Sequence, residues 1–401
     1  MVAEKPQSGG DELAALDRWP EALSNLHARI AGRFRRPEVR ERVRRYLAGL
    51  LGRVERKNSW QMAEQMGETG PQGAQRLLNA ARWDADAVRD DLREYVVEHL
   101  GEEDSGMLIV DETGFLKKGK KSVGVARQYT GTAGKKENAQ VGVFLAYASK
   151  KGAAFVDRSL YLPREWTEDL ERRAEAGVPQ KIRFATKGEL AKEILRRAFE
   201  AGMPARWVVA DTVYGTARGL RGWLEEQECS YVLAVPATKG VYHEGTQRQA
   251  QSLAKDLPAE AWERVSAGTG SKGERLYDWA CVALPEPGAS AEVEGLRASR
   301  WLLVRRQIDD PNELTYYLAY GPKQTPTEEL IRVVGSRWTI EDCFEQAKGE
   351  VGLDEYEHRK WDAWYRHVTL SLLAHAYLAV LRSNAANGDK IGGKKGMAAP
   401  I

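Results

Sequence analysis

Short apolar runs alternate with amphipathic stretches between residues 107 and 236, and this alternation constrains the fold more than any other feature of the chain. Five of the runs have the length and composition of buried strands; they span 107–115, 141–149, 153–163, 205–211 and 230–236. The stretch 188–202 instead carries apolar residues at helical spacing. Strands followed by alternating helices and strands predict a mixed sheet with helices on its faces, so we expect an α/β fold.

The segments on either side differ from this region in the spacing of their apolar residues, which predicts further domains. Residues from about 17 to 100 are helical in pattern. Two short helical stretches separated by Gly67–Gly73 are compatible with a helix-turn-helix, although this turn is longer than DNA-binding motifs usually have. The expected parts are a disordered N-terminus (1–16), a helical DNA-binding domain (17–102), the first part of a catalytic core (103–236), a β-rich insertion (237–322), the second part of the core (323–385) and a flexible tail (386–401). In the apolar C-terminal helix we expect His367 and His375 to be core residues.

The composition excludes several classes of protein. With 42% hydrophobic and 29% charged residues, the chain resembles an ordinary globular protein. It contains no apolar run of about 18 residues, which a spanning helix needs, and its N-terminus lacks the features of a secretion signal. The three cysteines are Cys229, Cys281 and Cys343, spaced too widely for a cysteine zinc site, and they fit a reduced cytoplasm.

Basic residues are concentrated in two places although the net charge is only +2. Between Arg29 and Lys57 there are eleven Lys and Arg residues against three Glu, which would suit a polyanion such as DNA. The candidates there are Arg35, Arg36, Arg40 and Arg44. A second group follows the first strand and comprises Lys117, Lys118, Lys120, Lys121 and Arg127. The alternatives are a solvated helix face for the first group and a solvated hairpin tip for the second.

Three acids are candidates for a catalytic site. Asp111 and Asp211 each follow an apolar strand, and strand ends in an α/β sheet converge on a crevice. Either Asp alone is as well explained as the cap of the next turn. Arg337, Glu341 and Lys348 lie on one face of a predicted helix, as a carboxylate aimed at a metal with a cation on either side. The alternative is a salt-bridge ladder worth about 0.2–0.5 kcal/mol per pair.

Together these residues resemble the DDE transposases of bacterial insertion sequences. One group of that family carries Tyr, two residues, Arg, three residues, Glu, six residues and Lys. Arg337, Glu341 and Lys348 match this spacing, whereas the Tyr position holds Val334. The blocks VDETGFLKKGKKSVGVARQYTGTAGKKENAQVGV, ADTVYG and GLDEYEHRKWDAWYRHVTLSLLAH are similar to one branch of the family, and the resemblance covers about residues 55–385.

The resemblance implies a ribonuclease H-like catalytic domain whose third acid follows a β-rich insertion. It makes Asp111, Asp211 and Glu341 catalytic metal ligands and places Arg337 and Lys348 on DNA phosphates. The expected cofactor is Mg²⁺, for which Mn²⁺ can substitute, with two ions. The expected partner is double-stranded DNA, both transposon ends and target, bound by a homodimer in the bacterial cytoplasm in association with the nucleoid.

The sequence leaves several alternatives open. A transposase-derived DNA-binding protein without catalysis is the second hypothesis, and a repair nuclease of the same fold is the third. Glu345, one turn after Glu341, competes for the third-ligand role. Glu112 is expected to face away from Asp111, because neighbouring strand residues point to opposite faces. Trp301, in the insertion, either stacks on an unpaired base or packs in the core.

Overall fold

The computed structural model describes residues 19–270, 273–284 and 298–393, so the expected disorder at 1–16 lies outside the described residues. The chain forms two compact units. The helical unit contains residues up to Leu100, Ala176–Val178 and the chain from Gln346 onward; the sheet unit contains Gly101–Glu175 and Pro179–Glu345. Among the described residues, no helix has both the length and the apolar character needed to cross a membrane.

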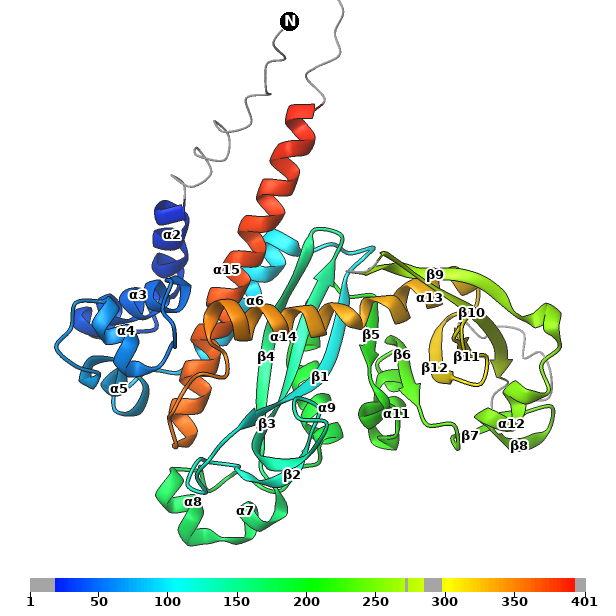
Figure 1. The fold of residues 1–401 in the computed structure, drawn as a ribbon, viewed down its shortest axis with the longest axis horizontal. Coiled ribbons are helices and arrows are strands. Elements are labelled where there is room, and N and C mark those ends of the chain that lie inside the picture. Colours follow the sequence, from blue (N-terminus) through cyan, green and yellow to red (C-terminus); the bar gives the residue numbers. More distant parts are fainter. Residues whose placement is uncertain (1–18, 271–272, 285–297, 394–401) are drawn as a thin grey trace, which may run out of the picture. The chain divides into compact units, whose positions relative to one another are not determined.

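The described part of the helical unit is built around one long C-terminal helix, α15 (Trp361–Gly393), which continues past the expected domain end at 385 (Figure 1). Within the described residues, five helices precede the sheet unit: α2 (Trp19–Ala31), α3 (Pro37–Leu51), α4 (Ser59–Gln65), α5 (Gln72–Asn79) and α6 (Ala85–Leu100). Helix α3 begins on a proline, whose fixed φ suits the first helical position. Asn58 caps α4 by accepting the N–H groups of Trp60 and Gln61, both at 3.0 Å.

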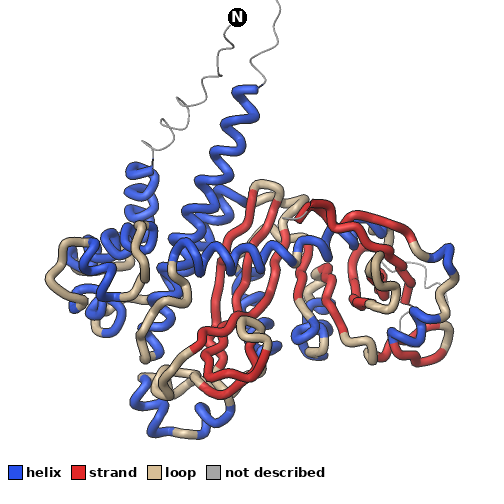
Figure 2. The backbone as a smooth tube through the Cα atoms, viewed as in Figure 1, coloured by secondary structure: helices blue, strands red, loops and turns tan. Residues whose placement is uncertain are grey.

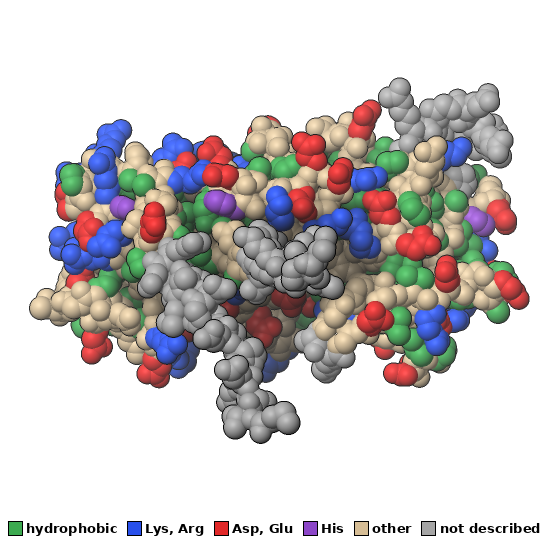
Figure 3. Space-filling view, turned by 90° about the horizontal axis from the view of Figure 1, so that it is seen from above, with side chains coloured by type: hydrophobic (Ala, Val, Ile, Leu, Met, Phe, Trp, Pro, Cys, Tyr) green, Lys and Arg blue, Asp and Glu red, His purple; other side chains and the backbone are tan. Residues whose placement is uncertain are grey.

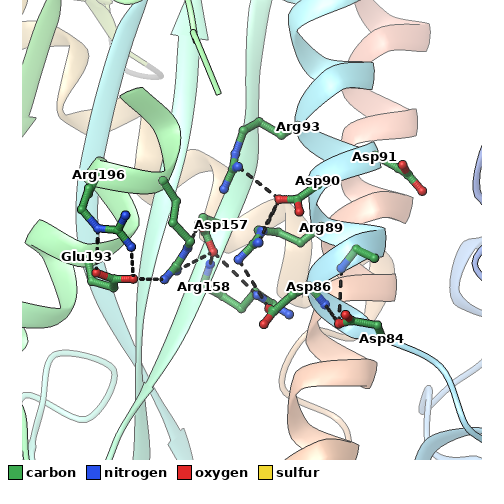
Figure 4. A network of polar contacts seen from close by, with 12 residues as sticks. Asp84, Asp86, Arg89, Asp90, Asp91, Arg93, Asp157, Arg158, Glu193 and Arg196 are labelled. Carbon is green, nitrogen blue, oxygen red and sulfur yellow. Dashed lines mark hydrogen bonds and ion pairs between the residues drawn. The ribbon is translucent and has the colours of Figure 1, made fainter. Parts of the chain in front are cut away.

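The core of the helical unit surrounds α15. This helix packs against α3, α5 and α6, so nearly all of its residues from 361 to 380 are buried, including His367 and His375 as expected. When other helices contact a helix on several sides, its apolar residues surround the whole helix and do not form a single apolar face. Charged pairs line α6, where Arg89 and Arg93 both reach Asp90, at 2.8 and 3.2 Å (Figure 4).

His375 gives the helical unit a pH-dependent stability. Burial lowers the pKa of His375 to about 3, and the positive charge of Arg382 acts in the same direction. The folded pKa is below the unfolded value of about 6.5, so the unfolded state binds the proton first and stability falls as pH falls through this window. We expect the stability advantage of wild type over His375→Leu to shrink by up to about 1.4 kcal/mol per pH unit below 6.5. Urea unfolding of both proteins between pH 7.5 and 4.5 measures this, and parallel curves would contradict it.

The described part of the sheet unit is built on one ten-stranded sheet, and Figure 2 shows its strands in red. The strands are β1 (Met107–Leu116), β2 (Ala126–Thr130), β3 (Lys135–Ser149), β4 (Gly152–Tyr161), β5 (Trp207–Ala210), β6 (Ser230–Val235), β9 (Glu263–Gly270), β10 (Gly273–Leu284), β11 (Ala298–Arg306) and β12 (Leu314–Pro322). They lie in the order β2-β3-β1-β5-β6-β12-β11-β10-β9, with β4 paired to β3. Among the described strands, only the pairs β1–β5 and β5–β6 are parallel, so the predicted mixed sheet is confirmed.

Helices flank this sheet, an arrangement that fits the expected ribonuclease H-like fold. They are α7 (Arg164–Glu168), α8 (Leu170–Ala176), α9 (Lys187–Glu200), α10 (Thr212–Gly215), α11 (Arg218–Glu226), α12 (Ala250–Lys255), the 3₁₀ turn η1 (Ala259–Ala261), α13 (Thr327–Ser336) and α14 (Trp338–Val351). A small hairpin, β7 (Gly240–His243) with β8 (Thr246–Gln249), stands apart from the large sheet. The other strands of the β-rich segment, β9 to β12, continue the large sheet, because β12 pairs directly with β6.

An aromatic cluster fixes α14 against this sheet. Phe344, three residues after Glu341, packs on Phe144 of β3 and Phe155 of β4, with ring centroids 5.3 and 4.8 Å apart. Each ring removes a large apolar area from water, and tilted or edge-on pairs add to that gain. The sheet face therefore holds the part of α14 that carries Glu341.

Candidate active site

The two aspartates lie side by side because of the register between two parallel strands. β1 pairs with β5 from Met107 opposite Trp207 to Val110 opposite Ala210, and Asp111 and Asp211 are the next residues. The expectation that both strands end at their acids was wrong for Asp111. β5 ends at Ala210, whereas β1 continues to Leu116 because it keeps pairing with β3 on its other side.

Each aspartate uses one oxygen to bind the local backbone. Asp111 Oδ1 accepts the N–H of Glu112 at 2.7 Å, and Asp211 Oδ1 accepts the N–H of Val213 at 2.9 Å. The second bond caps α10, so Asp211 does have the capping role that was its alternative explanation. Asp211 can cap α10 through Oδ1 and still take part in a site beside Asp111, since its carboxylate has a second oxygen.

Electrostatics set this pair apart from ordinary surface carboxylates. Burial, followed by the charge of Asp211, raises the pKa of Asp111 to about 7. Burial, followed by the charge of Glu112, also raises the pKa of Asp211. Two desolvated carboxylates that repel one another are stabilised by a cation, which offsets both effects.

Arg337 connects the aspartates to the third predicted acid. It lies between α13 and α14, and its Nη1 is 2.7 Å from Glu341 Oε1 and 4.0 Å from Asp111 Oδ2. The Glu341 side chain is 52% exposed, against 17% for Asp111. The i,i+4 ion pair expected as the alternative is therefore present, and it lies beside Asp111. Glu345 is exposed one turn further along α14.

The acids suit a divalent cation by charge but are not arranged as a complete set of ligands. No three Asp, Glu, His or Cys side chains within the described ranges are placed to hold one ion together. The site contains four carboxylates and two cations, which leaves two negative charges when all are ionised; these groups are Asp111, Glu112, Asp211, Glu341, Lys187 and Arg337. Asp111 and Asp211 fit hard-cation chemistry, while Glu341 is held by Arg337.

Glu112 takes part in this site, although sequence reasoning gave it no role. Its Oε1 accepts Lys187 Nζ at 2.5 Å, and its Oε2 accepts the hydroxyl of Tyr214 at 2.6 Å. Strand alternation separates it from Asp111, yet its charge still contributes to the raised pKa of Asp211. The signal in the sequence was Tyr214, three residues after Asp211 in the block ADTVYG.

An aromatic cluster that the sequence did not predict lies near Arg337. Trp301 is only 8% exposed, in agreement with core packing. Trp338, directly after Arg337, is half-buried and stacks on Tyr277 with centroids 6.4 Å apart and planes 9° apart. Arg305 lies 4.5 Å from the Tyr277 ring centre. Sequence reasoning missed this cluster because β10, β11 and α14 meet only in the folded sheet unit.

The basic residues predicted in the sheet unit lie after β1. Lys118, Lys120, Lys121 and Arg127 are exposed, and Lys117 is half-buried. Lys121 pairs with Glu175 at 3.1 Å. The loop itself is held to β3, because the Asn138 amide donates to the carbonyls of Lys117 and Gly119, at 2.5 and 3.0 Å. The backbone that carries these basic side chains is therefore fixed to β3.

In the helical unit the predicted basic residues have unequal environments. Arg40 donates to the carbonyl of Phe34 at 2.7 Å and Arg44 pairs with Glu41 at 2.7 Å, whereas Arg35 and Arg36 are exposed at the start of α3. Lys348 is half-buried, and burial lowers its pKa. On the face seen in Figure 3, Lys and Arg side chains are interspersed with Asp and Glu.

Gly215 lets α10 approach β6 closely enough to place Asp211. A Cβ at this position would lie 1.8 Å from the carbonyl oxygen of Ala234, and backbone cannot yield as a flexible side chain does. We expect Gly215→Ala to displace α10, to destabilise the chain by about 1–3 kcal/mol and to lower cleavage at least about tenfold. Gly219→Ala in α11 is the control, since its Cβ would meet nothing within 4 Å. Equal urea stability and DNA cleavage for the two variants would contradict this.

Comparison with known proteins identifies the family. The family described as "DDE superfamily endonuclease" matches residues 29–264, and "Transposase DDE domain" matches residues 180–377. The "Probable transposase for insertion sequence element IS701" of Microchaete diplosiphon is 27% identical over 325 residues, which cover 80% of this chain and 78% of that protein. A crystal structure of endonuclease V from Ciona intestinalis with DNA covers 65% of this chain and 96% of its own at 10% identity, but its TM-score of 0.22 is too low to show the fold. The chain therefore belongs to the DDE superfamily of endonucleases and is a DDE transposase, as its sequence predicted.

Proposed function

We propose that this chain is the transposase of a bacterial insertion sequence, and that it cleaves the ends of its element and joins them to target DNA by two-metal-ion phosphoryl transfer. The observation that carries the proposal is the half-buried pair Asp111 and Asp211 at the point where parallel pairing of β1 and β5 stops. Arg337 and Glu341 lie beside this pair. The similarity to a probable insertion-sequence transposase supports the choice of substrate.

Mg²⁺ is the proposed cofactor, with Mn²⁺ as a substitute, held by Asp111, Asp211 and Glu341. When bound, such ions activate a water or a DNA 3′-hydroxyl and stabilise the leaving oxygen. Backbone bonds to Oδ1 orient the two aspartates before DNA arrives. Glu341 gives up its ion pair with Arg337, whose planar guanidinium then binds a DNA phosphate.

The proposed partner is double-stranded DNA, comprising transposon ends and target, bound by a homodimer in the bacterial cytoplasm. We assign recognition of the ends to the helical domain at 17–102, where Arg35 and Arg36 are exposed. Lys118, Lys120 and Arg127 in the sheet unit are proposed contacts to DNA phosphates, together with Lys348. Such contacts give affinity without base specificity and weaken as salt rises.

The test is cleavage and joining of DNA that carries the element's own ends. With Mg²⁺ we expect wild-type protein to nick the ends and form joined products, and we expect Asp111→Ala to lower both by about 10³-fold or more, which corresponds to about 4 kcal/mol. Cleavage by wild type no greater than that of Asp111→Ala would refute the proposal. If wild type binds the ends but cuts nothing, the chain is a DNA-binding protein without catalysis.

A further inference from the structure

Glu112 joins three elements that surround the two aspartates. It belongs to β1, Lys187 is the first residue of α9, and Tyr214 belongs to α10. Each carboxylate oxygen has its own donor, Lys187 at 2.5 Å on Oε1 and the Tyr214 hydroxyl at 2.6 Å on Oε2. A side chain bonded at both oxygens is restricted to one rotamer, so its position is fixed by α9 and α10 together.

The surroundings of these bonds make them strong. The Tyr214 side chain is fully buried, and the side chains of Glu112 and Lys187 are only 16% and 21% exposed. A charge-assisted hydrogen bond in such surroundings is screened little by water, and its loss leaves a buried carboxylate oxygen without its donor. Among the described residues of the sheet unit, the Tyr231 hydroxyl bonds Glu225 at the same 2.6 Å, which provides a matched comparison.

The position of the bond relative to the aspartates points to its role. Glu112 is covalently next to Asp111, and Tyr214 lies in the short helix that Asp211 caps. The bond from Tyr214 to Glu112 thus ties the backbone that carries one aspartate to the backbone that carries the other. We propose that Glu112 is a positioning residue, which with Tyr214 and Lys187 holds Asp111 and Asp211 at a fixed separation for a divalent cation. This inference rests on the metal-binding site of the proposed function.

Binding of Mn²⁺ to the protein without DNA tests the role, with electron paramagnetic resonance reporting the free ion. We expect Tyr214→Phe and Glu112→Gln to weaken Mn²⁺ binding by about 10-fold, as loss of a group that orients metal ligands does. Tyr231→Phe, which removes a comparable bond elsewhere, is expected to keep the wild-type affinity. Unchanged affinity in Tyr214→Phe, or an equal loss in Tyr231→Phe, would overturn the proposal.

A second measurement needs no metal and separates this inference from the proposed function. The amides of Gly215 and Thr216 bond to Asp211 and Thr212 within α10. We expect them to exchange hydrogen at least about tenfold faster in Tyr214→Phe than in wild type, and at the wild-type rate in Tyr231→Phe. Unchanged exchange in Tyr214→Phe refutes the positioning role. If these amides exchange faster in Tyr214→Phe, but Asp111→Ala binds Mn²⁺ as tightly as wild type, the proposed metal site is refuted. The structural role of the Tyr214–Glu112 bond then still stands.

Discussion

Replacing Glu341 with Gln is expected to abolish cleavage of the element's ends, whereas the same replacement at Glu345 leaves cleavage within about twofold. Glutamine keeps the size of the side chain but removes the charge that a divalent cation needs, and loss of about 4 kcal/mol of transition-state stabilisation is a factor of about 10³. Glu345 is exposed on the same helix and one turn away, so it matches Glu341 in residue type and helix.

The measurement is the cleavage rate at saturating Mg²⁺ and again at saturating Mn²⁺. Urea unfolding should place both variants close to wild type, because the Glu341–Arg337 pair is half-exposed and such pairs contribute about 1 kcal/mol or less. If Glu345→Gln loses activity and Glu341→Gln keeps it, the third ligand is one turn further along α14. If neither loses activity, α14 supplies no ligand.

Lys57→Met is expected to destabilise the chain by about 3 kcal/mol, the largest stability effect that we predict. Lys57 is 6% exposed, and its ammonium donates to the carbonyl of Leu50 at 2.5 Å and also to the carbonyl of Glu350. Those carbonyls lie in the last turns of α3 and α14, where the peptide dipoles leave partial negative charge. Methionine fills the space but leaves both acceptors buried without this donor.

The control for Lys57 is Lys360→Met, because Lys360 is an exposed residue of the same unit that directly precedes α15. We expect it to change stability by no more than about 0.5 kcal/mol. Urea unfolding at pH 7 compares the two variants with wild type. Equal midpoints for Lys57→Met and wild type would mean that water or neighbouring groups satisfy both helix ends.

Elements with long, regular apolar patterns were predictable from the sequence. The strand at 153–163 and the helix at 188–202 form β4 and α9 close to those bounds, and the strand at 141–149 forms β3, which begins earlier, at Lys135. The position of Asp111 inside β1 rather than at a strand end was not, because pairing with β3 continues past Asp111 and Glu112. Local preference cannot reveal which neighbour a strand will have, and it is the neighbour that sets where the strand ends.

The candidate site was likewise predictable only in part from the sequence. Asp111, Asp211 and Glu341 were predicted from strand position and from spacing to Arg337, which are local features of the sequence. Glu112 was missed because its partners, Lys187 and Tyr214, are 75 and 102 residues away. The half-buried Trp338 beside Arg337 was also missed, because only the folded insertion brings Tyr277 to it. Such contacts depend on the order of strands in the sheet, which the sequence does not display.

The hydrogen bonding of β12 to β6 has a consequence for modular engineering of this enzyme. Pairing runs without a break from β5 through β6 and β12 into the inserted strands β11, β10 and β9. Every residue of β6 is buried, so trimming away 237–322 would leave an apolar strand with unsatisfied amides and carbonyls at a new sheet edge. Exposed edges of that kind recruit other chains and aggregate. The inserted strands therefore act as a protective border for the catalytic sheet, and any shortened version needs a substitute for β12.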